Sequence, residues 1–166
     1  MTTRSLMALA SLALITACSN GQAPDTGAPE PPPLTAATLG EQDVILPSAW
    51  LASPPYSDAD KTDGAKEARV CRACHTLEQG GANMIGPNLF GFFGRRAGAA
   101  EDFQYSQAFA EADFVWTPRA LDAWLRQPGR FLPGNRMSYP GVPRQESRDA
   151  LIAYLLEVTD ATSAAN

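Results

Sequence analysis

The sequence predicts an all-α fold in which three main helices and some short ones are joined by long loops. Two stretches, 117–127 and 144–159, repeat apolar residues at the spacing of a single helix face. Glycines crowd the stretch 78–102, which rules out regular structure there. No stretch alternates apolar and polar residues over the length of a strand. We therefore expect helices around irregular loops, without a sheet.

The first main helix should end near His75. Its start is marked by Asp60 or Asp63, because a carboxylate at the N-cap accepts hydrogen bonds from unpaired backbone N–H groups. After the glycine-rich loop, a short helix is expected from Ser106 to about Asp113.

The next helix has the clearest boundaries. Thr117 is a natural N-cap, Pro118 suits the first helical position, and Pro128 should end the helix. Its apolar face is formed by Leu121, Trp124 and Leu125. The last helix repeats this pattern with Leu151, Ile152, Tyr154, Leu155 and Val158.

The beginning of the chain has the features of an export signal. Arg4 precedes an apolar run, Leu6–Ala17, that ends in small residues before Cys18. The run is shorter than the ~20 residues needed to span a bilayer, so a transmembrane anchor is the weaker interpretation. Ile15-Thr16-Ala17-Cys18 resembles a bacterial lipobox, which predicts a lipoprotein signal peptide at 1–17 and a lipid on Cys18. The alternative is a chance cysteine beside an ordinary cleavage site.

Residues 18–57 are expected to form a tether. They are rich in proline, and residues 20–60 hold six acids and no Lys or Arg, a composition that favours an extended, hydrated chain. About 40 such residues would average roughly 35 Å end to end as a flexible coil. An apolar island at 44–51 has two interpretations: packing against the chain's own domain, or a docking strip for a partner complex.

The folded part should comprise residues 58–160, followed by a tail, 161–166. From Lys61 onward there are twelve basic and twelve acidic residues, so the domain is nearly neutral. The net negative charge of the chain therefore belongs to the tether. This balance does not favour nucleic-acid binding.

Cys71-Arg72-Ala73-Cys74-His75 is the C-x-x-C-H pattern of covalent haem attachment. Two thiols bond the two vinyl groups of the porphyrin, and the adjoining imidazole becomes an axial ligand of the iron. A zinc site or a redox dithiol is the alternative, but zinc needs further Cys or His ligands. His75 is the only histidine of the chain. The sequence therefore predicts one covalent haem c.

Two methionines outside the signal segment could supply a second axial ligand. Met137 lies in a stretch, 133–141, whose Gly and Pro residues can hold a loop flat against a ring. Met84 follows His75 by only nine residues and is better explained as an apolar loop residue. Taken alone, Met137 could equally be a core methionine.

The sequence resembles the class I cytochromes c of the mitochondrial and alphaproteobacterial type over about 90 of its 166 residues. The matching blocks, in order, are CRACHT, GG, GPNLFGFFGRRAG, FQYS, WT, LPGNRM and RDALIAYL. The resemblance implies the class I cytochrome c fold, wrapped around one haem, with His75 and Met137 as axial ligands.

The resemblance also implies residues that hold the haem. The carbonyl of Pro87 should accept the ring N–H of His75. The residues matching those that bind the haem propionates are Arg95, Tyr105 and Trp116 for the inner one and Ser106 for the other. Without the resemblance, Arg95 would be a solvated surface residue and Trp116 a core residue.

Some positions depart from the family pattern. Phe109 and Trp124 replace an asparagine and a tyrosine beside the methionine, and Asn135 replaces a threonine, which should make that side of the haem drier. Gly64 is one residue closer to the attachment segment than expected, and Ala68 stands where an aromatic residue normally packs on the last helix.

A haem iron closed by His and Met leaves no position for substrate, so we expect an electron-transfer protein and no enzyme activity. The sequence predicts a lipid-anchored carrier on the periplasmic side of a bacterial membrane, between a quinol:cytochrome c reductase and a terminal oxidase or reaction centre. A haem subunit docked permanently in a larger complex is the alternative. The resemblance also implies basic residues around the exposed haem edge, at Arg72, Arg130, Arg136 and Arg144.

Overall fold

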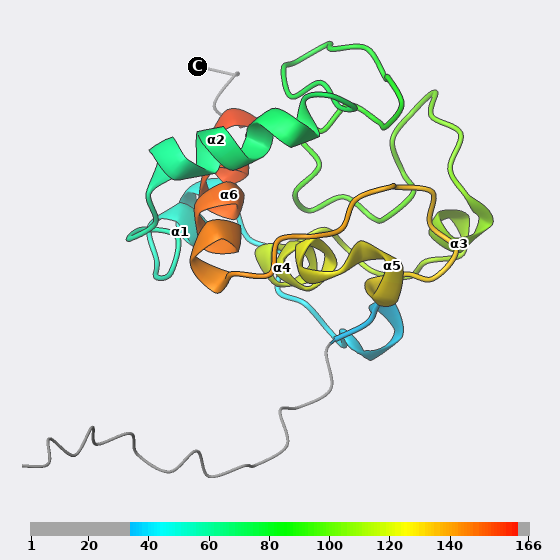
Figure 1. Ribbon diagram of the computed structural model, residues 1–166, viewed down its shortest axis with the longest axis horizontal. Coiled ribbons are helices and arrows are strands. Elements are labelled where there is room, and N and C mark those ends of the chain that lie inside the picture. The colour runs from blue at the N-terminus through cyan, green and yellow to red at the C-terminus, as the bar shows by residue number, and fades with distance from the viewer. Residues whose placement is uncertain (1–33, 163–166) are drawn as a thin grey trace, which may run out of the picture. The chain divides into compact units, whose positions relative to one another are not determined.

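The computed structural model describes residues 34–162, which belong to one folded unit (Figure 1). Extended pairing within them is limited to one isolated bridge between Arg96 and Val115, so the all-α prediction is confirmed. In chain order the helices are the 3₁₀ helix η1 (Ala36–Thr38), α1 (Pro47–Leu51), α2 (Lys61–Cys71), α3 (Gln107–Ala110), α4 (Pro118–Arg126), α5 (Pro128–Phe131) and α6 (Gln145–Val158).

Helix α2 starts where its cap was expected but ends earlier. The side chain of Asp60 accepts hydrogen bonds from the backbone N–H groups of Thr62 (2.8 Å) and Asp63 (3.3 Å), so Asp60 is the N-cap. The helix ends at Cys71, four residues before the predicted end at His75. The attachment segment therefore lies mostly in the turn that follows α2.

Helices α2 and α6 pack closely against each other (Figure 1). Gly64 permits this contact, since a Cβ atom at that position would lie 2.1 Å from the carbonyl oxygen of Ala150. Ala68 is completely buried on the same helix. Gly64 therefore allows the two helix backbones to approach each other, and Ala68, which stands where the family has an aromatic residue, adds little bulk to α2.

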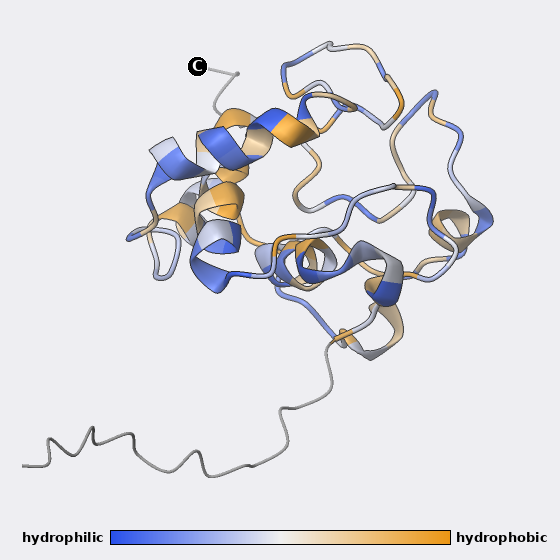
Figure 2. Cartoon of the chain, viewed as in Figure 1, coloured by the Kyte–Doolittle hydropathy of each residue, from blue (hydrophilic) through white to orange (hydrophobic). Residues whose placement is uncertain are grey.

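Helices α4 and α6 match their predicted positions. The Thr117 hydroxyl accepts a hydrogen bond from the N–H of Ala120 (3.2 Å), and α4 ends before Pro128 as predicted. Pro128 also begins a new short helix, α5, which was not predicted. Helix α6 lies within one residue of its expected bounds. Figure 2 shows it hydrophilic at its start and hydrophobic over much of the rest.

The structure corrects the predicted tether boundary at residue 57. Residues from 34 onward pack onto the domain: Leu39 is 1% exposed, and Trp50 and Leu51 lie against the core. Helix α1 contacts α6, and the side-chain oxygen of Gln42 accepts a hydrogen bond from the Thr117 hydroxyl. Burial of these apolar side chains outweighs the extended preference of a proline-rich, acidic composition. Any tether thus ends before residue 34.

Aromatic side chains fill the core beside the long loops. Phe114 makes edge-to-face contacts with Trp116 (ring centroids 4.9 Å apart) and Phe131 (5.3 Å). Trp124 of α4 joins the same cluster, 5.8 Å from Trp116. Such edge-to-face pairs favour particular orientations of the rings, so the cluster is a well-ordered part of the core beside the loops.

The predicted signal segment 1–17, Cys18 and the last four residues lie outside the described residues. Between residues 34 and 162, no helix has the length and apolarity that crossing a bilayer requires.

Candidate haem-binding site

The attachment segment forms a compact turn at the end of α2. The backbone N–H groups of Cys74 and His75 both donate to the carbonyl of Cys71, at 3.0 and 2.9 Å. This turn holds the two cysteines three residues apart on one irregular segment. Neither cysteine is in a disulfide, and both are partly exposed.

The alternatives to haem find no support in this part of the chain. Residues 34–162 contain no cluster of three or more His, Cys, Asp or Glu side chains that could hold a metal ion. Burial raises the pKa of the Cys71 thiol to about 11. A thiol with a raised pKa forms a thiolate less readily than a free cysteine does.

The ring of His75 is held in one orientation. Its Nδ1 lies 2.7 Å from the carbonyl oxygen of Pro87, the contact that the resemblance implied. A carbonyl can only accept, so Nδ1 carries the proton and Nε2 keeps its lone pair. Burial lowers the pKa of His75, although the hydrogen bond to Pro87 opposes this shift. The result is a neutral imidazole whose free nitrogen suits a metal ion.

Gly86 also helps to hold the imidazole ring of His75 in position. A Cβ atom at Gly86 would lie 2.2 Å from Cε1 of His75, so a side chain there would push the imidazole out of position. The N–H of Gly86 also donates to the carbonyl of Cys74 (2.9 Å). The loop after the attachment segment therefore folds back over the histidine and fixes it from a second side.

The loop that carries Met137 is pinned by Asn135. The Asn135 side-chain oxygen accepts from the N–H of Met137 (2.9 Å), and its amide nitrogen donates to the carbonyls of Leu132 (2.8 Å) and Pro128 (3.1 Å). Met137 is partly buried against the core. Asn135, which departs from the family pattern, thus supplies three hydrogen bonds that shape the loop.

The other methionine lies in a different setting. Met84 is 49% exposed, on the loop just before Gly86. Tyr139, two residues beyond Met137, is partly buried, and burial raises the pKa of its hydroxyl, with a smaller contribution from negative charge at Cys71 and Glu67.

The four residues predicted to hold the propionates lie in one region. The N–H of Trp116 donates to the carbonyl of Arg95 (2.9 Å), and the charge of Arg95 partly offsets the effect of burial, which raises the pKa of Tyr105. The hydroxyl oxygen of Ser106 is buried and has no hydrogen-bond partner among the described residues. A buried hydroxyl without a partner is costly, so this orphan fits an acceptor that a haem propionate would supply. These residues fit a haem.

Aromatic rings replace polar groups near the methionine loop. Phe109 lies 5.4 Å from Trp124 and 6.3 Å from Trp116, measured between ring centroids. Phe109 has no polar atom in its side chain, and Trp124 is 4% exposed. The two substituted positions thus contribute aromatic rings that contact each other; the drier environment expected from them stays a prediction.

Arg148 was counted in the sequence only among the basic residues, yet it is 2% exposed. Its Nε donates to a carboxylate oxygen of Asp122 (2.7 Å), and its Nη1 donates to the carbonyls of Val142 (2.9 Å) and Pro143 (2.8 Å). It thereby ties the end of the Met137 loop to α4 and α6. This burial was not predicted from the sequence; the available signal was that Arg148 shares one helix face with Ile152 and Leu155, at spacings of four and three residues.

No protein-family model matches the chain, but curated proteins do. Cytochrome c of Theileria parva is 37% identical over 120 residues, which cover 72% of this chain and 95% of that protein. Cytochrome c of Trypanosoma brucei brucei is 45% identical over 82 residues, 49% of this chain and 88% of that protein. Cytochrome c2 of Agrobacterium tumefaciens (strain II Chrys) is 39% identical over 102 residues, 60% and 92% respectively.

Proposed function

Because this chain belongs to the class I cytochrome c family, we propose that it is a membrane-tethered carrier of single electrons. It binds one covalent haem c and is an electron-transfer protein, not an enzyme. The proposed route runs from a quinol:cytochrome c reductase to a terminal oxidase or a photosynthetic reaction centre. The proposed location is the periplasmic side of a bacterial membrane.

The observation that best supports this function is the fixed, neutral imidazole of His75, 2.7 Å from the Pro87 carbonyl. When bound, the haem supplies a one-electron iron couple whose potential depends on its axial ligands and surroundings. Cys71 and Cys74 would attach it, and His75 and Met137 would bind the iron. A ligand that is held rigidly before and after an electron moves keeps the reorganisation small, which favours electron transfer over chemistry on a bound molecule.

The remaining site residues set the environment. Arg95, Tyr105, Ser106 and Trp116 would donate hydrogen bonds to the propionates, so that their charge is not left unpaired on burial. The rings of Phe109 and Trp124, which contact each other, would make the methionine side of the haem drier.

Replacing each of the two candidate methionines by leucine tests which of them binds the iron. In Met137→Leu we expect loss of the weak far-red absorption band of the oxidised protein and ready binding of azide to the ferric iron. Met84→Leu is the matched control, because Met84 is half-exposed, and its spectrum should be unchanged. If Met84→Leu lost the band and Met137→Leu kept it, the proposed ligand would be wrong.

The membrane tether is proposed from the sequence of the signal and from Cys18. Because residues 34–57 belong to the folded unit, the proposed tether is reduced to residues 18–33. Such a tether raises the effective concentration of the carrier near membrane partners. Cys18→Ala should release a soluble protein with an intact haem spectrum, whereas Ser19→Ala should stay in the membrane fraction. Retention of the Cys18→Ala protein in the membrane would exclude the lipid anchor.

A permanently docked haem subunit is the second candidate. It is favoured by Val44, Ile45 and Leu46, which are about half-exposed although they are large and apolar. After gentle solubilisation, release from its partners at moderate salt would support the carrier, and co-purification at high salt would support the subunit.

A further inference from the structure

The apolar island at 44–51 has two faces. Trp50 and Leu51 pack against the core, which is the first of the two interpretations of the sequence. Val44, Ile45 and Leu46 point elsewhere and are 52%, 46% and 59% exposed. Three adjacent large apolar side chains exposed to this degree are unusual unless another surface covers them.

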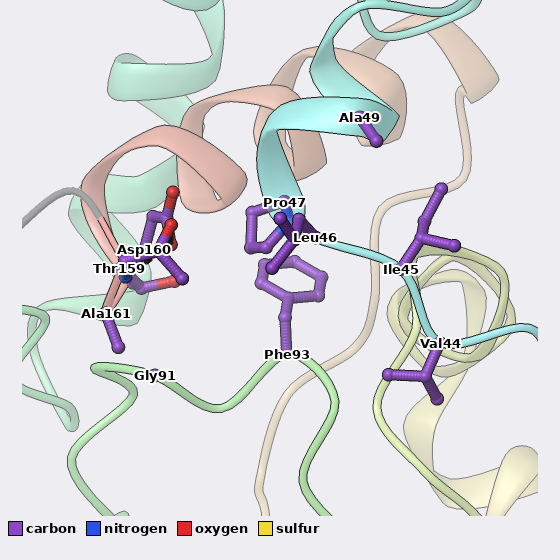
Figure 3. A pocket seen from close by; sticks show the side chains of 11 residues that line it. Val44, Ile45, Leu46, Pro47, Ala49, Gly91, Phe93, Thr159, Asp160 and Ala161 are labelled. Atoms are coloured by element: carbon purple, nitrogen blue, oxygen red, sulfur yellow. Dashed lines mark hydrogen bonds between the residues drawn. The ribbon is translucent and has the colours of Figure 1, made fainter.

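These side chains border a groove (Figure 3). The groove has a volume of about 570 Å³ and a mainly apolar lining, to which residues 44–47, Phe93 and residues 159–162 contribute. Figure 3 shows the ring of Phe93 beneath Pro47 and Leu46, with Thr159, Asp160 and Ala161 on one side. The volume suits a few apolar side chains of a partner.

Contacts with the rest of the domain hold the segment that lines the groove, so the groove exists before a partner binds. Trp50 contacts Phe93 in a tilted arrangement, with ring centroids 6.1 Å apart. Gln42 is hydrogen-bonded to Thr117. At Gly94, an added Cβ would lie only 3.2 Å from Val44, so the segment sits directly on the loop. A preformed groove loses little conformational entropy when a partner binds.

The exposed charges on the segment that leads into the groove are negative: they belong to Glu41 and Asp43. Asp160 lines the groove but is 8% exposed and accepts hydrogen bonds from Thr162. No Lys or Arg is among the lining residues. An anionic lipid surface would be repelled by these carboxylates, whereas a basic protein segment would be attracted.

We propose that this groove docks a segment of a partner protein that presents apolar side chains flanked by Lys or Arg. None of the residues proposed to hold the haem lines the groove. A partner could therefore hold the domain here without occupying the haem site, which goes beyond the electron-transfer function.

Photo-cross-linking of the full-length haem-loaded chain in its native membrane tests this proposal. Benzoylphenylalanine replaces Ile45, and the cross-linked peptide is identified by mass spectrometry. The matched control has the probe at Val70, which is 50% exposed next to the attachment segment. We expect one protein partner at Ile45, absent at Val70, whose cross-linked peptide combines apolar residues with at least two Lys or Arg.

Charge reversal completes the test. Glu41→Lys with Asp43→Lys should lower the cross-link yield at Ile45 by about tenfold and leave the haem spectrum unchanged. The proposal fails if Ile45 cross-links to lipid, to a second copy of this chain, to a peptide without basic residues, or to nothing. It also fails if charge reversal leaves the yield unaltered. An altered haem spectrum in the unsubstituted chain would instead count against the electron-transfer site.

Discussion

Replacement of Arg148 by Met should destabilise the protein and loosen the Met137 loop. Arg148 is almost fully buried, and its loss leaves the carbonyls of Val142 and Pro143 without their side-chain donor and the Asp122 carboxylate without its cation. Asp122 keeps a hydrogen bond from the side-chain amide of Gln145 (2.9 Å). Breaking a buried ion pair costs about 3–5 kcal/mol. The Asp122 side chain is 29% exposed and regains some hydration, so we expect the lower end, about 3 kcal/mol.

For a domain of this size, about 3 kcal/mol lowers the melting temperature by roughly 10–15 °C. Thermal unfolding followed by circular dichroism measures the loss. The far-red band of the oxidised protein should also weaken, because the end of the methionine loop is no longer tied to α4 and α6. Arg144→Met is the matched control: Arg144 is exposed, and its Nη2 reaches only the Ser147 hydroxyl at 3.3 Å.

A double substitution separates the contribution of the ion pair to stability from that of side-chain packing. Asp122→Leu combined with Arg148→Met removes both partners, so the loss should be smaller than the sum of the two single losses. A melting temperature for Arg148→Met within about 3 °C of the parent, with an unchanged far-red band, would refute the role assigned to this buried network.

Three further predictions concern other parts of the fold. Gly64→Ala should destabilise by about 3 kcal/mol or more, because its Cβ would collide with the α6 backbone, whereas Gly129→Ala, with open space around it, should be nearly neutral in the same denaturant titration. Leu39→Ala should cost about 2–5 kcal/mol by the same measurement, and a silent substitution would mean that residues 34–57 are not part of the core. Burial, helped by nearby carboxylates, raises the pKa of Tyr56 well above its usual 10.0, so the folded state holds this proton more tightly. The free energy of unfolding should therefore fall as the pH rises above about 10. In the Tyr56→Phe protein, this free energy should fall less steeply between pH 8 and 11.

Local signals in the sequence predicted the helices that have strong caps. Thr117 and Pro118 place the start of α4 because a cap depends on residues two or three positions away. The same holds for Asp60 at the start of α2. The contact between His75 and Pro87 was implied only by the family resemblance, since the two residues are twelve positions apart in an irregular loop.

Tertiary contacts explain what the sequence did not predict. The prolines and acids of residues 18–57 favoured a tether throughout, but burial of Leu39 and the packing of Trp50 against the core depend on surfaces that only the folded domain provides. The role of Arg148 depends on Asp122, which comes from a different helix. Composition describes a segment by itself and cannot report the surface against which it packs.

The contact between Gly64 and Ala150 joins two points that are far apart along the chain. Helix α6 is the last of the described helices in chain order, so α2 lacks this packing partner until almost the whole domain has been synthesised. The attachment segment, 71–75, at the end of α2 is therefore held in place by residues from the far end of the domain.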